Sequence, residues 1–374
     1  MNEFIIDYAD VFLLRTTIKE PIVTSFGKME SRSAVLIRII DNNGYIGWGE
    51  AWCNFPIYAA ENRVNFFTTE LVSKLLGRKV NHPKTVFLKL WNELRAISNQ
   101  SGDRGTVSQV LAGIDLALWD IKAQRSKQPL WKLLGGANSC IQTYASGINP
   151  NNPAAIVEQK LSEGYTAFKL KIGFDPDLDR QNLDQIRKLI GQSFKLMADA
   201  NQAWTPNQAQ SMIQSIENTK LVWLEEPLPA DSTSSEWKEL VEFSPFPIAV
   251  GENLYHYDSF IWAIKSNFFR YIQPDLSKWG GISGCLDIGK TALKNRVIFC
   301  PHWLGSGIGL LASAHLLAGV GGEGYLEVDA NINPLQNLFE EDLMQPIDGK
   351  FFLGDSPGLG KTLSLDALKE FGQS

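Results

Sequence analysis

The segment IQTYAS (141–146) begins a series of short β-rich segments that decides the fold. Seven more follow at steps of about 24 to 29 residues, the kind of steady spacing that repeated units produce. They are TAFKLKIG (166–173), KLMADAN (195–201), LVWLEEP (221–227), PIAVGEN (247–253), YIQPD (271–275), VIFCP (297–301) and YLEVD (325–329). The gaps hold candidate helices, for example over 153–164 and 205–217. Eight such strand–helix units predict an α/β protein with a closed (β/α) barrel rather than an open sheet.

The N-terminal third has a different pattern. AVLIRII (34–40) and YIGWGEA (45–51) flank the sequence Asp-Asn-Asn-Gly at 41–44, which predicts a β-hairpin. Residues 106–125 repeat apolar side chains at three- and four-residue steps, which predicts an amphipathic helix. Pro129 and the two glycines that follow it mark a boundary. The segment after 331 is too short for another domain, and we expect it to pack back on the N-terminal part.

Composition excludes several classes of protein. The 374 residues carry a net charge of −6, whereas nucleic-acid and anionic-membrane partners need a basic face. The four cysteines lie far apart without a CxxC pair, so neither a disulfide framework nor a zinc knuckle is expected. No positively charged leader and no apolar stretch of about 18 residues is present. We therefore expect a cytoplasmic globular protein that binds neither nucleic acid nor membrane.

Polar residues end nearly every segment of the series, at the strand edge where barrel enzymes carry their active sites. Three carboxylates, Asp199, Glu225 and Glu252, end three successive strands. Clustered carboxylates repel one another unless a cation lies among them, and oxygen ligands without His or Cys suit Mg²⁺. The alternative is that each acid caps a helix or pairs with a surface arginine. The other strand-end residues are Lys169, Lys171, Asn201, Glu226, Asn253, Asp275, His302, Glu327 and Asp329.

Two pairs among these residues suggest acid–base chemistry. Lys169 and Lys171 lie two apart on one strand and therefore point to the same face, here the barrel interior. A buried lysine beside another lysine and a divalent cation should have a lowered pKa and could act as a general base. Asp275 could fix the tautomer of His302, which would make a second acid or base. The alternatives are an exposed lysine pair and a structural histidine, as we expect His315 to be. Glu226 and Asp329 are interpreted as structural.

A glycine-rich segment offers a competing interpretation. LGSGIGLLASA (304–314) approximates a dinucleotide-binding fingerprint, with Glu327 about 20 residues further on. Its glycine spacing is G-x-G-x-G rather than G-x-G-x-x-G, and too little chain follows for the remaining strands of a nucleotide-binding sheet. Alternatively, the free N–H groups of this helix start could receive a substrate carboxylate or oxyanion.

Taken together, KLKIG, ADANQAW, WLEEPL, VGEN, QPDLSKWGGISG and CPHW resemble the enolase superfamily, specifically its mandelate racemase subgroup. The resemblance covers nearly the whole chain and includes the boundary ALWDIKAQRSKQPLWKLLGG. It implies a modified (β/α)₇β TIM-type barrel over 129–330 with an α+β capping domain over 1–128, completed by the segment 331–374. It also implies Mg²⁺ held by Asp199, Glu225 and Glu252.

The resemblance further assigns roles to the basic residues. It implies that Lys171 abstracts a proton α to a carboxylate, and that Lys169 contacts this carboxylate and lowers the pKa of Lys171. It implies that Asp275 and His302 form a dyad on the opposite face, and that a protonated Glu327 hydrogen-bonds the enediolate oxygen. Muconate-lactonizing and dipeptide-epimerase relatives carry Lys in place of Asp275. Whether Lys278 enters the site is left open by the sequence.

The expected reaction is Mg²⁺-dependent proton abstraction followed by β-elimination, either dehydration or lactone opening, on a sugar acid. A racemase, epimerase or cycloisomerase with the same residues is the alternative, and a catalytically silent binding protein is a third. The capping loops near 17–31 and 50–60 are expected to contact the small carboxylate substrate, as is Asn201. Their hydroxyl, amide and amine groups favour a polar, anionic substrate, although the same groups could be loop surface. A homo-oligomer is expected. The candidate loop contacts are Thr24, Ser25, Lys28, Trp52, Asn54 and Tyr58.

Overall fold

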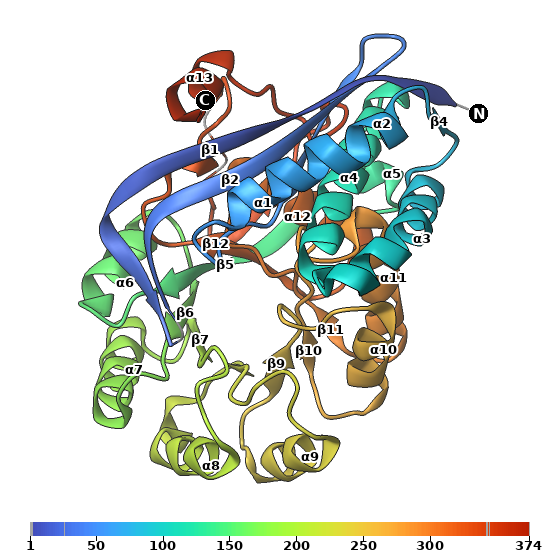
Figure 1. Cartoon of the computed structure of the whole chain (residues 1–374). Helices are drawn as coiled ribbons and strands as arrows, with labels where there is room; N and C mark the ends of the chain where they lie inside the picture. The colour runs from blue at the N-terminus through green and yellow to red at the C-terminus, as the bar shows by residue number, and fades with distance from the viewer. Residues whose placement is uncertain (1–2, 26, 342, 344, 374) are drawn as a thin grey trace.

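The computed structural model describes residues 3–25, 27–341, 343 and 345–373. Eight parallel strands form a nearly closed barrel in the order β11-β10-β9-β8-β7-β6-β5-β12. Every segment of the predicted series contributes a strand, which confirms the barrel (Figure 1). The strands are β5 (Cys140–Ile148), β6 (Ala167–Lys171), β7 (Lys195–Asp199), β8 (Leu224–Glu225), β9 (Ile248–Val250), β10 (Tyr271–Ile272), β11 (Ile298–Phe299) and β12 (Tyr325–Asp329).

Helices between these strands cover the outside of the barrel (Figure 1). Their starts carry the expected signals: Asp175 caps α7 ahead of Pro176, and Thr205 forms a capping box with Gln208 at the start of α8. The helices are α6 (Pro153–Ser162), α7 (Pro176–Ile190), α8 (Pro206–Ser215), α9 (Ser234–Phe243), α10 (Tyr257–Lys265), α11 (Gly281–Lys294) and α12 (Gly307–Val320), with a 3₁₀ turn at Glu217–Thr219.

The N-terminal part is an antiparallel sheet in the order β3-β2-β1-β4, which confirms the capping sheet. The predicted hairpin joins β2 to β3, with Asp41 accepting the N–H groups of Asn43 and Tyr45 at 2.9 Å each. The elements are β1 (Phe4–Thr24), β2 (Gly27–Asp41), β3 (Ile46–Ala51), α1 (Ala59–Phe66), a π-helical turn (Phe67–Leu71), α2 (Val72–Leu75), β4 (Lys79–Val80), α3 (Pro83–Ser101), α4 (Arg104–Arg125) and α5 (Leu130–Leu133).

The long helix α4 lies against the capping sheet, and β3 approaches it closely. A Cβ atom at Gly47 or Gly49 would collide with the backbone carbonyl of Ala117 or Gly113. Only glycine permits this close approach of strand to helix. Nearly all of α4 is buried, because it packs on the capping sheet and also contacts α11 of the barrel. The capping sheet is therefore firmly seated on the barrel.

The tip of the β1–β2 hairpin reaches the barrel mouth (Figure 1). Val23 donates its backbone N–H to Asn149 Oδ1 at 3.2 Å, and the Ser25 hydroxyl donates to the carbonyl of Asn201 at 2.8 Å. Phe26 of the predicted 17–31 loop lies outside the described residues. These contacts bring the end of the hairpin to the carboxyl ends of β5 and β7.

The C-terminal segment contacts both parts of the molecule. It contains a 3₁₀ turn (Pro334–Gln336), β13 (Lys350–Phe352) and α13 (Leu365–Phe371). β13 pairs antiparallel with β5, and Gln373 donates its backbone N–H to the carbonyl of Leu13 in β1. The exact domain boundaries at 128 and 331 stay predictions.

The barrel interior below the mouth is filled by aromatic rings. Trp223 lies 5.3 Å from Tyr144 and 4.8 Å from Tyr271 between ring centroids. These residues are buried and form a floor under the polar mouth. No helix among the described residues is long and apolar enough to cross a membrane. All four cysteines carry free thiols, as expected from their spacing.

Candidate active site

Lys171 ends β6 opposite Asp199, which ends β7, because the two strands pair in parallel register. The Lys171 ammonium donates to Asp199 Oδ2 at 2.6 Å and to Asn201 Oδ1 at 2.7 Å. Asn201 in turn donates its backbone N–H to Asp199 Oδ1 at 2.8 Å. All three residues are buried. The structure thus brings together three of the residues that the sequence placed at strand ends.

Lys169 lies deeper in the barrel and is completely buried. Its ammonium lies 2.7 Å from both oxygens of Glu225 and 2.8 Å from Glu327 Oε1. It does not line the cavity described below. Burial acts to lower the pKa of Lys169, but Glu225 and Glu327 outweigh it, so the pKa lies well above its usual value. In this arrangement Lys169 is a buried counter-ion for two carboxylates.

His302 follows β11 and lies between two carboxylates. Its Nδ1 is 2.8 Å from Asp275 Oδ2 and its Nε2 is 2.6 Å from Glu252 Oε2. Asp275 is fixed in turn by the backbone N–H groups of Ser277 and Lys278, at 2.8 and 3.0 Å. Burial acts to lower the pKa of His302, but Glu252 and the other neighbouring carboxylates raise it well above its usual value.

Two expected protonation states differ from the structure. The pKa of Lys171 is raised rather than lowered, because the contact with Asp199 outweighs the opposing effects of burial and of Lys169. Glu327 was expected to be protonated, yet its pKa is lowered to about 2: burial acts to raise it, and Lys169 and His302 outweigh burial. Both shifts have one cause, since each group lies directly against an opposite charge, and the protonation states expected beside a divalent cation stay predictions.

Carboxylates outnumber cations among the described residues of the barrel mouth. With every group ionised, the six buried carboxylates and four buried basic groups there leave an excess of two negative charges. Consistently, burial and neighbouring carboxylates raise the pKa of Glu226 well above its usual value, and burial raises that of Glu225 to about 7. The six acids are Asp199, Glu225, Glu226, Glu252, Asp275 and Glu327; the bases are Lys169, Lys171, Lys278 and His302.

This excess of negative charge and the all-oxygen donor set fit a divalent cation such as Mg²⁺. Glu226 adds a buried oxygen, Oε1, that has no hydrogen-bond partner. As the side chains stand, no group of three or more His, Cys, Asp or Glu among the described residues encloses a metal position. The reason is visible in the contacts above: lysine or histidine groups lie against Asp199, Glu225 and Glu252.

A cavity of about 190 Å³ lies at the mouth between the barrel and the capping sheet. Seven of the predicted site residues line it, and so does Lys278, which the sequence left open. Sequence reasoning did not assign the other six to the substrate site. The predicted residues are Thr24, Trp52, Asn54, Lys171, Asn201, Glu252 and His302, and the additional ones are Ile22, Met29, Phe55, Gln202, Asn253 and Leu304.

Three of the predicted capping-loop contacts do not line this cavity. The side chain of Lys28 is 56% exposed and lies 3.4 Å from Glu30, and Tyr58 is 59% exposed. Ser25 contacts the carbonyl of Asn201 instead. Lys28 and Tyr58 therefore belong to the loop surface, because the strand and turn that carry them direct their side chains to solvent.

The glycine-rich helix start of α12 is filled by the protein itself. Glu50 of β3 accepts the backbone N–H groups of Ser306 and Gly309 at 2.8 and 2.9 Å and also bonds the Ser306 hydroxyl. The suggestion that this helix start receives a substrate group was therefore wrong. Glu50 occupies the positive end of the helix with its own carboxylate.

The residues that we expected to be structural contact other parts of the protein. Asp329 pairs with the buried Arg32 of the capping sheet. His315 accepts the backbone N–H of Trp131 at 3.0 Å, in agreement with a structural role. Glu226 accepts a hydrogen bond from Asn253 at 2.7 Å.

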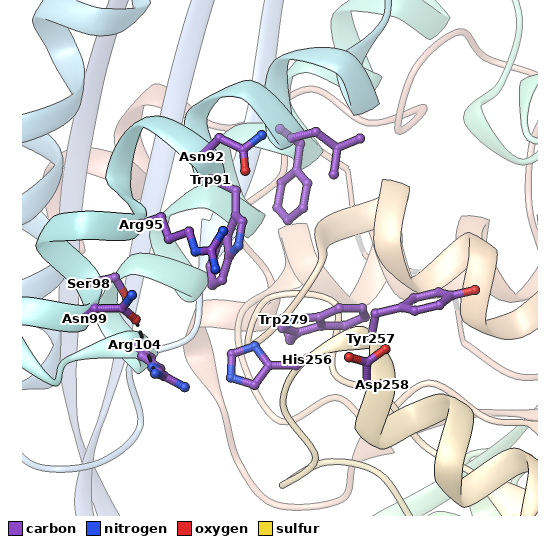
Figure 2. Close-up of a pocket in the computed structure, with 12 residues that line it drawn as sticks. Trp91, Asn92, Arg95, Ser98, Asn99, Arg104, His256, Tyr257, Asp258 and Trp279 are labelled. Carbon is purple, nitrogen blue, oxygen red and sulfur yellow. Dashed lines mark hydrogen bonds between the residues drawn. The ribbon is translucent and has the colours of Figure 1, made fainter.

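A second, larger hollow lies on the outside, between α3 and the start of α10. Figure 2 shows Trp91 of α3 facing His256 and Trp279 across it. Its volume is about 480 Å³, and none of the predicted catalytic residues lines it. The barrel mouth is therefore the candidate active site.

Comparison with known proteins agrees with this geometry. Residues 8–135 match the N-terminal domain of mandelate racemase and muconate lactonizing enzyme, and residues 153–367 match the enolase C-terminal domain-like family. The chain belongs to the enolase superfamily, in the mandelate racemase/muconate lactonizing enzyme subgroup. It is consequently an enzyme of the superfamily that abstracts a proton next to a carboxylate.

Individual relatives span several reactions. A crystal structure of a mandelate racemase/muconate lactonizing enzyme from Bordetella bronchiseptica RB50 is 42% identical, with a TM-score of 0.92 over 99% of both chains. D-galactarolactone cycloisomerase from Agrobacterium fabrum is 28% identical over 96% of both chains. A variant of L-talarate/galactarate dehydratase, solved with Mg and L-glucarate, is 28% identical with a TM-score of 0.87 over 100% of this chain and 92% of that one.

Proposed function

We propose that the protein is a Mg²⁺-dependent lyase that removes the proton α to the carboxylate of a sugar acid and then expels a β-oxygen substituent. One observation carries the proposal. Lys171 on β6 and His302 after β11 line the same cavity from different strands, and each is fixed by a carboxylate. A base and an acid on separate strands can act on two neighbouring carbons of one substrate.

The proposed steps balance as follows. Neutral Lys171 Nζ takes the α proton, and the electron pair of the broken C–H bond forms the double bond of an enediolate. As the enediolate collapses, its electron pair forms the double bond between the α and β carbons, the bond from the β carbon to its oxygen breaks, and protonated His302 gives its Nε2 proton to that oxygen. A hydroxyl leaves as water, a ring oxygen leaves as an opened lactone, and the resulting enol tautomerises to a 2-keto acid. Lys169 and Glu327 are proposed to form a buried ion pair beneath the bound carboxylate and so to hold neighbouring charged groups in position.

Asp199, Glu225 and Glu252 are the residues that would hold Mg²⁺. When bound, Mg²⁺ supplies positive charge that stabilises the extra negative charge on the substrate carboxylate. Lys171 must leave Asp199, and His302 must leave Glu252, before these carboxylates can serve as ligands. The same displacement frees both groups for the substrate, so metal loading and activation of the acid–base pair would be linked.

An isomerase is the alternative reaction. It is favoured by the whole-length similarity to a cycloisomerase. Reprotonation of the enediolate by His302 at Cα, without loss of a β-oxygen, would give an epimer.

The deciding experiment uses the purified protein with Mg²⁺, D₂O and a panel of aldonic, aldaric and lactone acids. A 2-keto product that is lost in Lys171→Ala and His302→Asn variants supports the lyase. Deuterium at Cα without a 2-keto product supports the isomerase and rejects the lyase. Metal removal with EDTA should abolish turnover, and Mg²⁺ should restore it. A parent protein that neither exchanges deuterium nor converts any acid would contradict both reactions.

A further inference from the structure

We propose that the substrate of this cavity carries a single carboxylate and that its distal end is uncharged. The inference rests on the proposed function, because it takes the reacting carboxylate to lie beside Lys171 and the carboxylate cluster. It concerns the opposite wall of the cavity, which the capping sheet and the loop after β11 form.

That wall is apolar. Ile22 of β1, Met29 of β2 and Leu304 are 1%, 8% and 8% exposed and line the cavity with Phe55 and Trp52. A carboxylate against such a wall would lose its hydration and gain no opposite charge. The C–H surface of a sugar ring or of a neutral chain would instead lose little and pack on these side chains.

Three polar side chains of the cavity donate hydrogen bonds to other protein groups. Thr24 donates its hydroxyl to the carbonyl of Gly27 at 3.0 Å, and Asn54 donates its amide to the carbonyl of Leu304 at 2.6 Å. The amide of Asn253 donates to Glu226 and Glu252 at 2.7 and 2.8 Å. Neither the Thr24 hydroxyl nor the Asn253 amide can bind a second carboxylate without breaking an existing hydrogen bond.

Lys278 is the remaining cation that lines the cavity besides Lys171 and His302, and it too is engaged. Its ammonium donates to the carbonyl of Glu252 at 3.0 Å and to Asn253 Oδ1 at 3.1 Å. It also lies 4.6 Å from the centre of the Trp52 ring, a cation–π contact. Two of the three ammonium donors are used in these hydrogen bonds, and the charge faces the ring. Lys278 is thus held in place by the loop after β9 and by Trp52.

The overall charge points the same way. With all six acids ionised, the described residues of the barrel mouth have two negative charges in excess. A divalent cation would balance this excess, and no further positive charge would remain to balance a second substrate carboxylate. A dianionic aldarate would therefore bring two uncompensated charges into the cavity, whereas an aldonate, a lactone acid or an anhydro acid would bring only one.

The test compares probes that differ only at the distal end. For each sugar configuration in the panel, the aldarate is compared with its far-end monomethyl ester and with the corresponding aldonate. We expect the kcat/KM of the diacid to be at least about 100-fold below that of the ester. Equal or faster conversion of the diacid would overturn the inference. If no acid reacts, the proposed function fails, and calorimetric binding of ester against diacid still decides the distal charge.

Variants make the cause explicit. Met29→Lys places a cation on the apolar wall and should shift the ratio of diacid to ester kcat/KM at least about 10-fold toward the diacid, with Met29→Gln as the neutral control. Leu304→Lys, with Leu304→Gln as its control, serves if the first variant does not fold. A folded lysine variant with an unchanged ratio would contradict the inference. So would Lys278→Met if it impaired the diacid alone, because Lys278 would then be the receptor for a distal carboxylate.

Discussion

Glu50 Oε1 accepts the backbone N–H of Ser306 at 2.8 Å, so a carboxylate of the capping sheet closes the N-terminus of barrel helix α12. Asp115 of α4 does the same at the start of α11, where it accepts the N–H of Ser283 at 2.8 Å. Both acids are buried. The capping part is therefore attached to the barrel by buried carboxylates at two helix ends.

This attachment should make the stability of the protein depend on pH. Burial raises the pKa of Glu50 from 4.5 to about 7, although bonds from Ser306 and Gly309 oppose it. Folding then favours the protonated group, so its contribution is complete below pH 4.5 and is lost as the pH rises through about 7. At about 1.4 kcal/mol per pKa unit, the free energy of unfolding should fall by about 3 kcal/mol across this window.

The check is urea unfolding of the wild type and Glu50→Gln at several pH values between 4.5 and 8. Because Gln does not titrate, the variant should show a flatter dependence, with the difference confined to this window. Exposed Glu242→Gln is the matched control and should leave the slope unchanged. Parallel curves for wild type and Glu50→Gln would show that Glu50 does not titrate as described.

Asp115 gives a second stability prediction. Its carboxylate accepts both the N–H and the hydroxyl of Ser283, the latter at 2.6 Å. Asp115→Ala leaves the N–H buried without this partner and should lower the free energy of unfolding by about 2 to 4 kcal/mol. Ser283→Ala keeps this N–H bond but removes the acceptor of the Trp119 indole N–H, so it should cost about 1 to 2 kcal/mol. Equal losses in the two variants would contradict this division.

The affinity for Mg²⁺ should depend on two residues beneath the mouth. Glu225 Oε2 accepts the indole N–H of Trp223 at 3.0 Å and the amide of Gln273 at 2.8 Å. Trp223→Phe or Gln273→Met removes one of these bonds and should weaken Mg²⁺ binding about 10-fold or more, measured by calorimetry. Tyr271→Phe is the control, because Tyr271 packs on Trp223 and makes no hydrogen bond to Glu225 among those described. Unchanged affinity in both variants would reject Glu225 as a ligand.

Asp275→Asn should separate the two halves of the proposed reaction. Asp275 fixes His302 through Nδ1 at 2.8 Å, whereas Lys171 is held independently by Asp199 and Asn201. The rate of 2-keto acid formation should fall about 100-fold or more, while deuterium exchange at Cα through Lys171 continues. Ser277→Ala, which removes one hydrogen bond to Asp275, should have a smaller effect. Equal loss of exchange and elimination would argue against distinct roles for the two groups.

The barrel and most of the polar mouth were predictable from the sequence. Strand spacing and strand-end polarity are local properties, and parallel pairing places strand ends together, as it does for Lys171 and Asp199. Which carboxylate each basic side chain contacts at the barrel mouth was not predictable. Whether Lys169 faces a substrate or Glu225 depends on ångström-scale placement that residue types do not encode.

The capping-loop contacts were predicted less well for a related reason. Residue polarity favoured Lys28 and Tyr58, but the local path of the chain directs them to solvent and places Ile22 and Met29 at the cavity. The alternation along β1 and β2 could have indicated this, since Ile22 and Met29 form a cross-strand pair. The hydrogen bond from Ser306 at the start of α12 to Glu50 joins residues 256 positions apart in the sequence. No local sequence pattern predicts such a contact.

The pairing of β5 with β12 has a consequence for synthesis in the cell. Ser146 of β5 lies opposite Asp329 of β12. One edge of β5, the first barrel strand, therefore stays unpaired until β12, the last one, has been synthesised. The ribosome must therefore release almost the entire chain before the barrel can close. We expect nascent chains that stall before β12 to expose a bare strand edge, and such chains would be natural clients of chaperones.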